Sequence, residues 1–371
     1  MYSNKTPIVV DIGSSIIKAG FIGTDLPSLV FPNYFGEFKY PSALNFIREE
    51  NEKLIGNDCK KYLGVLKLKY PVSHGLFLDK NSIGPLFKYI YKKLKIDLDE
   101  IKEHPLLIAE PMLSPEKYME DIINELYAEF KTNYFLFASQ PILSMFSTSK
   151  TTGAILESGG GLTQSCLISE GYSIPGTYKR INLGGKEITE NLQMLLCKKG
   201  YNFNKSDNFL VLNSIKEEVC DLNVVDKNTK IENVNYKLPD DTIIEIGEER
   251  YLAPNILFNP LLNEFEYPGI HEILFDSISK TNVELKLKFY NSIILTGGNT
   301  KMKGYKERLN HEMKKITPKN LKIRLHTPNN PEFSPWIGGN IISSMENTKK
   351  MWVSYKEYYE SGRIPRFSTI V

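Results

Sequence analysis

The sequence contains little cysteine, and its cysteines are not spaced for metal binding. Only four of the 371 residues are cysteine, and no two of them have the CxxC spacing. This pattern argues against a zinc site and against a disulfide framework. We therefore expect reduced thiols, as in cytosolic and nuclear proteins. The four are Cys59, Cys166, Cys197 and Cys220.

Long apolar runs and a surplus of charge of one sign are also missing. No segment approaches the roughly 20 apolar residues of a membrane span. The N-terminal stretch MYSNKTPIVVDIG has no apolar run of the signal-peptide kind. Lys and Arg together number 46 and Asp and Glu 44, which gives a net charge of +2. The sequence thus predicts no membrane span and gives no electrostatic reason to expect nucleic-acid binding.

What the sequence does contain is one local pattern that occurs twice. A chain of 371 residues is long enough for two or more domains. Residues 7–11 and 16–23 read as a strand hairpin around a Gly/Ser turn, and residues 152–158 and 162–169 repeat this layout. Helical spacing follows in several segments, among them 82–94, 114–130, 209–220 and 304–315. We therefore predict an α/β protein with two similar halves.

The two turns have the composition of a phosphate-binding site. Glycine lets backbone N–H groups approach an anion closely, and serine adds hydroxyl donors. Asp11 and Glu157 end the strands before these turns, where Mg²⁺ between carboxylate and phosphate would remove the repulsion. A single glycine turn is usually only a turn. Two copies, with Gly297 and Gly298 after a third strand, instead predict two phosphate-binding hairpins that face each other across a cleft.

Three segments, DIGSSIIKAG, ESGGG and LTGGNT, resemble the nucleotide-binding segments of the superfamily of actin, Hsp70 and sugar kinases. Further stretches are similar to actins, in actin order and at near-actin spacing, over essentially the whole chain. They are LKLKYPVSHG, EHPLLIAEPMLSP, SKTTG, PGIHE, WIGGN and MWVSYKEYYESG. The resemblance implies the actin-like ATPase fold, with two similar α/β domains (four subdomains) around a nucleotide cleft. It places residues 1–147 and 334–371 in one large domain and 148–333 in the other, with small excursions at 34–70 and 184–265.

The resemblance implies ATP and Mg²⁺ as cofactors. It assigns Asp11 to the metal's water shell and Gln140 to the attacking water, with Glu157 and Gln164 as the other catalytic positions. The nucleotide-binding positions it implies are Gly13, Ser14, Ser15, Lys18, Gly159, Gly160, Gly161, Lys216, Glu217, Gly297, Gly298 and Met302. His74 matches a histidine that actins methylate.

Several of these positions depart from the actin pattern. Ser15 stands where actins have glycine, and Gly160 stands where they have aspartate. Glu157 replaces an aspartate and Gln164 a histidine, so the resemblance implies slow hydrolysis. Around the base, Asn213 replaces an arginine, Met302 a tyrosine and Glu332 a lysine. Because Glu332 exchanges a favourable charge for an unfavourable one, we expect weaker nucleotide binding than in ordinary actin.

Two classes of function follow from the resemblance. The first is a cytoplasmic, cytoskeletal filament subunit that assembles with itself or with other actin-family subunits. FPNYFG, IEIGEERYLAPNILF and KKMWVS are most similar to the centractins of dynactin, which implies dynactin-like or actin-binding partners. The loop at 261–267, with Phe265 and Tyr267 as apolar anchors, favours assembly, whereas the segment 37–46 has no likeness to actin's subunit-gripping loop. The second class is a non-polymerising scaffold subunit, as in chromatin-remodelling complexes. The actin-specific stretches leave no segment for a sugar site, so an enzyme of the sugar-kinase type is disfavoured.

Overall fold

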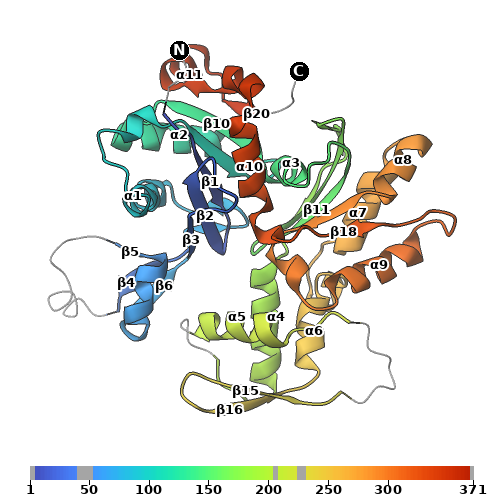
Figure 1. The fold of residues 1–371 in the computed structure, drawn as a ribbon. Coiled ribbons are helices and arrows are strands. Elements are labelled where there is room, and N and C mark those ends of the chain that lie inside the picture. Colours follow the sequence, from blue (N-terminus) through green and yellow to red (C-terminus); the bar gives the residue numbers. More distant parts are fainter. Residues whose placement is uncertain (1–4, 40–52, 204–207, 224–230, 368–371) are drawn as a thin grey trace.

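The computed structural model describes residues 5–39, 53–203, 208–223 and 231–367, which build two large mixed sheets (Figure 1). The first sheet has the order β19-β10-β9-β1-β2-β3, with β20 paired to β10, and the second has the order β13-β12-β11-β17-β18, with β14 paired to β12. The strands of the first sheet are β1 (Ile8–Ile12), β2 (Ile16–Phe21), β3 (Leu29–Pro32), β9 (Leu106–Glu110), β10 (Tyr134–Ser139), β19 (Val353–Ser354) and β20 (Arg366–Phe367). Those of the second are β11 (Gly153–Ser158), β12 (Thr163–Ser169), β13 (Tyr172–Ser173), β14 (Lys179–Ile181), β17 (Ile293–Thr296) and β18 (Leu325–His326).

The two sheets are built around the same unit. In the first sheet β1 pairs antiparallel with β2 and parallel with β9. In the second sheet β11 pairs antiparallel with β12 and parallel with β17. The predicted α/β class with two similar halves is therefore confirmed.

The central strands are buried on both faces, and alternate residues enter different cores because the side-chain period of a strand is two. On β1, Ile8 and Val10 pack in one apolar cluster with residues of α1 (Ile83–Lys93) and α2 (Glu116–Phe130), whereas Val9 packs in another. On β11, Ala154 and Leu156 pack with the helices of the second half, and Ile155 joins the cluster that contains Val9.

The shared cluster forms the centre of the molecule. It contains residues of both sheets together with α3 (Gln140–Phe146) and α10 (Ser334–Ser344), which lie between the sheets in Figure 1. Trp336 on α10 is fully buried, and its indole N–H donates to the Val9 carbonyl at 3.1 Å. This apolar centre holds the first turns of the two sheets in a defined relation to each other.

Smaller elements extend from each half. On the first side are β4 (Phe35–Phe38), β5 (Leu54–Ile55), β6 (Leu66–Lys69), the hairpin β7 (Val72–Ser73) and β8 (Leu76–Phe77), and α11 (Tyr355–Ser361). On the second side are α4 (Gly185–Lys198), α5 (Asn208–Val219), α6 (Glu249–Asn255), α7 (Ile270–Ser279), α8 (Val283–Tyr290), α9 (Tyr305–Ile316) and the hairpin β15 (Val234–Lys237) and β16 (Ile243–Ile246). The predicted domain boundaries at 147/148 and 333/334 stay predictions.

The surface does not match every expectation. Phe265 and Tyr267, predicted as apolar anchors of assembly, are partly buried against the core of the second half. Leu261 and Leu262 of the same loop are instead exposed, at 74% and 75%. The stretch 40–46 of the segment 37–46 lies outside the described residues.

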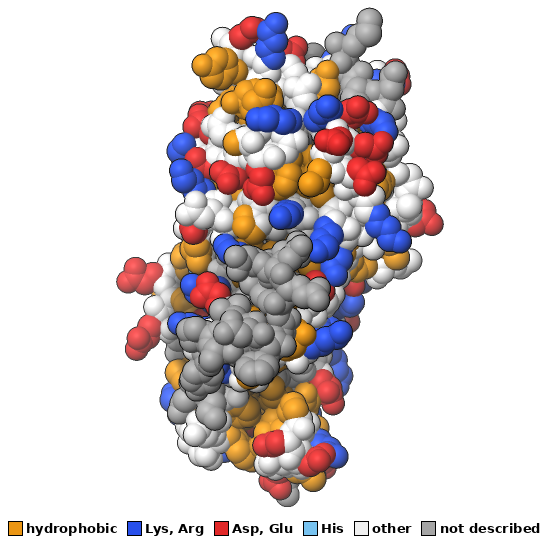
Figure 2. Space-filling model, turned by 90° about the vertical axis from the view of Figure 1, so that its left-hand side faces the viewer, with side chains coloured by type: hydrophobic (Ala, Val, Ile, Leu, Met, Phe, Trp, Pro, Cys, Tyr) orange, Lys and Arg blue, Asp and Glu red, His pale blue; other side chains and the backbone are white. Residues whose placement is uncertain are grey.

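The charges of the surface are mixed, in line with the small net charge. On the face in Figure 2, outside the grey atoms, acidic and basic side chains are interspersed with apolar patches. In the ranges that the structure describes, no helix combines the length and the apolar character needed to cross a membrane.

Candidate functional site

The first hairpin places a carboxylate and an ammonium group directly opposite each other. Asp11 on β1 and Lys18 on β2 are partners in the strand register, and Lys18 Nζ lies 2.9 Å from Asp11 Oδ2. The other carboxylate oxygen accepts a hydrogen bond of 2.8 Å from Gln140 Nε2, at the start of α3. Asp11 is almost fully buried, so this pairing is what allows its charge to remain there.

The second hairpin repeats this arrangement without the cation. Glu157 on β11 and Gln164 on β12 are register partners at the corresponding place, with 3.4 Å between Gln164 Nε2 and Glu157 Oε2. Burial and the nearby Asp11 charge raise the pKa of Glu157 to about 8, against the weaker opposing effects of Lys18 and Gln164. Glu157 therefore holds a proton at neutral pH in the unliganded cleft.

The turns of the two hairpins lie against each other. A Cβ atom added to Gly160 would overlap Ser15 Oγ, and one added to Gly161 would overlap Ser14 Oγ. Ser14 Oγ also accepts from the Gly75 N–H at 2.8 Å. His74 Nδ1 lies 2.6 Å from the Gly161 carbonyl, so this ring nitrogen carries the proton. Methylation of His74 stays a prediction.

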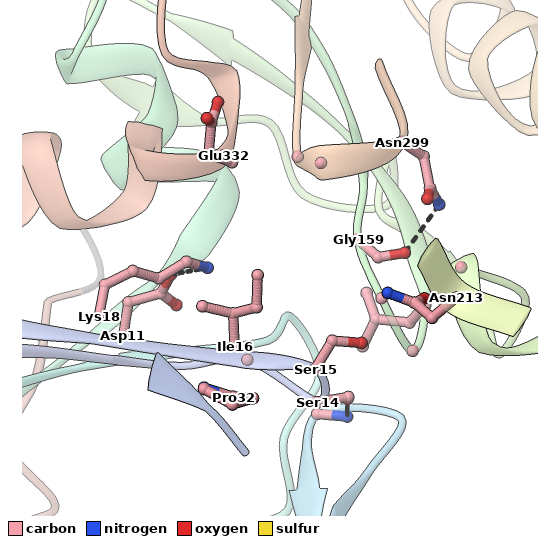
Figure 3. A pocket seen from close by; sticks show the side chains of 18 of the residues that line it. Asp11, Ser14, Ser15, Ile16, Lys18, Pro32, Gly159, Asn213, Asn299 and Glu332 are labelled. Atoms are coloured by element: carbon pink, nitrogen blue, oxygen red, sulfur yellow. Dashed lines mark hydrogen bonds and ion pairs between the residues drawn. The ribbon is translucent and has the colours of Figure 1, made fainter. Parts of the chain in front are cut away.

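A third turn, after β17, joins the second one. Gly297 has φ +88°, and a Cβ there would overlap the Ser158 carbonyl oxygen, so only glycine fits. Asn299 Nδ2 donates to Ser158 Oγ at 3.1 Å and to the Gly159 carbonyl at 2.8 Å. Figure 3 shows Gly159 and Asn299 on the side of the cavity that faces the Asp11–Lys18 pair. A Cβ on Gly298 would meet no atom within 4 Å, so this position borders open space.

The ammonium group of Lys216 is bonded within the protein and is not free to bind a ligand. Its ammonium group donates to the Gly185 carbonyl at 3.0 Å, to Thr189 Oγ1 at 3.0 Å and to Asn213 Oδ1 at 2.6 Å. These bonds use all three of its donors. Burial lowers the pKa of Lys216 to about 8. Lys216 thus orders α5 against α4, and its neighbour Glu217, which accepts 2.7 Å from Asn213 Nδ2, is the more exposed polar group.

The unfavourable effect that we expected Glu332 to have on nucleotide binding is reduced by a neighbouring lysine. Glu332 Oε1 lies 2.6 Å from Lys301 Nζ. The carboxylate is therefore neutralised by a lysine from the third turn, and the predicted unfavourable charge is compensated. Sequence reasoning missed Lys301 because nothing local links it to a residue 31 positions further along the chain.

These groups surround a cavity of about 680 Å³, within the usual range for a small-molecule site. All the predicted site residues line it except Gln164. Gln164 is fully buried behind them, where its Oε1 accepts from the Met112 N–H at 2.9 Å and its Nε2 donates to Gln140 Oε1 at 3.3 Å. It is a positioning residue for Gln140 and Glu157.

Aromatic residues that the sequence did not single out also line the cavity. Tyr34 and Tyr70 come from the first half, and Phe209 comes from α5 of the second. The Tyr70 and Phe209 rings are 5.5 Å apart in an edge contact. Leu210, next to Phe209, packs against the small cluster that contains Tyr34 and Leu66. The small excursions of the two halves thus contact each other beside the cavity.

The charges in the cavity suit a triphosphate only together with a divalent cation. Its cations are Lys18, Lys216 and Lys301, and its carboxylates are Asp11, Glu157, Glu217 and Glu332. Two of the lysines are paired with carboxylates. In the described part of the chain, no three His, Cys, Asp or Glu residues are grouped to hold a metal alone. Mg²⁺ commonly binds through one or two carboxylates, waters and substrate phosphates, and Asp11 beside the glycine turns fits that pattern.

Comparison with known proteins gives a consistent result over the whole chain. The Actin family matches residues 3–365. A protein described as "Actin-like protein" from Neurospora crassa is 35% identical over 372 aligned residues, which cover 97% of this chain and 97% of that protein.

Proposed function

The chain belongs to the actin family, and on this premise we propose that it binds ATP with Mg²⁺ in the cavity between its two halves. The observation that carries the proposal is the contact of two equivalent glycine turns, one from each sheet, at the wall of one cavity. Backbone N–H groups of such turns are suited to phosphate oxygens from both sides.

The side chains have distinct parts in this proposal. Lys18 forms an ion pair with Asp11, and its ammonium group would also contact a phosphate. Asp11 would bind the metal through the metal's water molecules. A bound Mg²⁺ would neutralise phosphate charge. Glu217 and Met302 line the part of the cavity left for the nucleoside, with the thioether able to pack on a base.

We expect hydrolysis to be slow. Activation of a water requires groups within hydrogen-bond reach of it. Gln140 lines the cavity, but its amide is bonded to Asp11 and Gln164 and is not a base. Glu157 and Gln164 stand where actins have an aspartate and a histidine, so the groups that would act on the water are changed.

The second part of the proposal is assembly into filaments in the cytoplasm, with copies of itself or with other actin-family subunits. The exposed Leu261 and Leu262 support it, since two adjacent leucines at 74% and 75% exposure leave apolar surface in water that a contact with another subunit would bury. A centractin-like place in a dynactin-type complex is the specific form that the sequence resemblance favours.

Calorimetric titration with Mg-ATP tests the nucleotide site. Gly298→Leu should extend an apolar side chain into the cavity, because Gly298 lines it and a Cβ there meets nothing within 4 Å, and should abolish binding while the unliganded protein keeps its melting temperature. Gly64→Leu is the matched control, since a Cβ at Gly64 also meets nothing within 4 Å and Gly64 lies outside the cavity lining. If the native protein gave neither heat of binding nor a thermal shift with Mg-ATP, the proposal would be wrong.

A further inference from the structure

Two departures from the actin pattern, at Ser15 and Gly160, meet at one point in space. Ser15 belongs to the turn between β1 and β2, and Gly160 to the turn between β11 and β12. A Cβ atom at Gly160 would overlap Ser15 Oγ and would lie 2.7 Å from Ser15 Cβ. Rotation of the serine hydroxyl removes the first overlap but not the second. The side chain of Ser15 therefore occupies the space that any side chain at position 160 would need.

The neighbouring pair shows how Ser15 differs. Gly161 has the same relation to Ser14, but the Ser14 hydroxyl already accepts a hydrogen bond from the Gly75 N–H. Ser15 is exposed to the cavity that it lines. Its hydroxyl has no hydrogen-bond partner among the residues that the structure describes. The Ser15 hydroxyl is thus free of hydrogen bonds to the described residues, whereas the Ser14 hydroxyl is held by the Gly75 N–H and keeps its own O–H for a ligand.

We propose that Ser15 and Gly160 form a matched pair that decides which of the two turns supplies the side-chain group at the phosphate end of the cavity. In this chain the first turn supplies a neutral hydroxyl, and the second turn is glycine because Ser15 fills the space. In the actin pattern the arrangement is reversed: glycine stands at the position of Ser15, and a carboxylate stands at the position of Gly160. This inference rests on the proposed nucleotide function.

The exchange has a consequence for metal dependence. A hydroxyl can donate to a phosphate oxygen directly, whereas a carboxylate at the same place repels phosphate unless a cation lies between them. The native pair should therefore bind ATP with less dependence on Mg²⁺ than a protein with the reversed pair. In Ser15→Gly/Gly160→Asp, the ratio of ATP affinity in Mg²⁺ to that in EDTA should be at least tenfold larger than in the native protein.

A double-mutant cycle tests the pairing itself. Gly160→Ala should lower the melting temperature of the unliganded protein and weaken Mg-ATP binding by at least tenfold. Adding Ser15→Gly should recover the melting temperature, to the value of Ser15→Gly alone, and most of the affinity. Gly159→Ala is the stability control, because a Cβ there has its nearest neighbour, the Leu162 carbonyl oxygen, at an ordinary 3.6 Å.

The outcomes separate this proposal from the function on which it rests. If Gly160→Ala matches the native protein in both melting temperature and affinity, or if Ser15→Gly fails to rescue it, the matched pair is overturned while ATP binding stands. An unchanged ratio between Mg²⁺ and EDTA in the reversed pair overturns the role assigned to the hydroxyl. If the native protein binds no ATP, both the proposed function and the role of the Ser15 hydroxyl in ligand binding are wrong. The melting temperatures would still test the steric pairing of Ser15 with Gly160.

Discussion

Gln164 lies opposite Glu157 on the second hairpin at the register position where Lys18 lies opposite Asp11 on the first. The contact is 3.4 Å between an amide nitrogen and a carboxyl oxygen, in place of a 2.9 Å ion pair. The two hairpins therefore have the same backbone arrangement but carry different charges at equivalent positions. The first hairpin pairs its carboxylate with an ammonium group, whereas the carboxyl group of the second has no cation opposite it and its pKa is raised to about 8.

The raised pKa of Glu157 predicts a pH-dependent stability. Between its ordinary pKa near 4.5 and about 8, the folded protein holds a proton that the unfolded chain has released. Stability should therefore fall as pH rises through this window, by up to roughly 1.4 kcal/mol per pH unit from this group. Thermal unfolding of the unliganded native protein and of Glu157→Gln from pH 5.5 to 8 should show the native curve falling relative to the variant. Parallel curves would contradict the shift.

Loss of the ammonium group on the first hairpin should weaken nucleotide binding. Lys18→Ala removes a cation beside the glycine turn, and we expect at least tenfold weaker Mg-ATP binding, about 1.4 kcal/mol, with a similar loss for Asp11→Asn. Because Lys18→Ala also leaves Asp11 buried without its partner, the melting temperature should drop. Lys18→Ala/Asp11→Asn should recover the melting temperature but not the affinity. Recovery of both would mean that Lys18 acts only on Asp11.

Hydrolysis should respond to the two substituted positions of the second hairpin. Glu157→Asp together with Gln164→His should release phosphate faster than the native protein in a single-turnover assay, because both changes restore the actin residues. Gln164→Ala should instead destabilise the protein by about 1–3 kcal/mol, since it leaves the buried Met112 N–H without an acceptor. A native protein that hydrolyses ATP as fast as ordinary actin would refute the slow-hydrolysis proposal.

The ring contact beside the cavity should slow the release of nucleotide. Tyr70 and Phe209 bring together the small excursions of the two halves at 5.5 Å. An aromatic pair of this kind contributes about 0.5–1.5 kcal/mol, so Phe209→Ala should release a fluorescent ATP analogue roughly two- to tenfold faster. Leu287→Ala, on the surface of α8, is the control. Equal release rates in all three proteins would show that this contact does not hold the nucleotide.

Assembly should depend on the exposed leucines and not on the aromatic residues of the same loop. Leu262→Asp should abolish sedimentation of assembled protein in Mg-ATP and leave the melting temperature unchanged, because Leu262 is 75% exposed. Phe265→Asp should lower the melting temperature, since Phe265 packs against the core. If the native protein stays monomeric at high concentration, the scaffold alternative is favoured instead.

The local elements and the resemblance to a family can be recognised in the sequence alone. The apolar runs around Val9 and Ile155 predict buried strands, and glycines after them predict tight turns, because strand burial and turn geometry depend on neighbours in the chain. The repetition of this unit was sufficient to predict two similar halves.

The partner of each polar group depends on how distant segments pack together, and the sequence does not predict it. In the folded protein Gln164 lies behind the cavity, and the ammonium group of Lys216 donates all three of its hydrogen bonds to other residues. Glu332 pairs with Lys301, and Ser15 lies against Gly160. These relations join segments that are far apart in the chain and meet only when the sheets pack around α3 and α10. The charge and the free space at a site depend on these contacts, and no local pattern of residues encodes them.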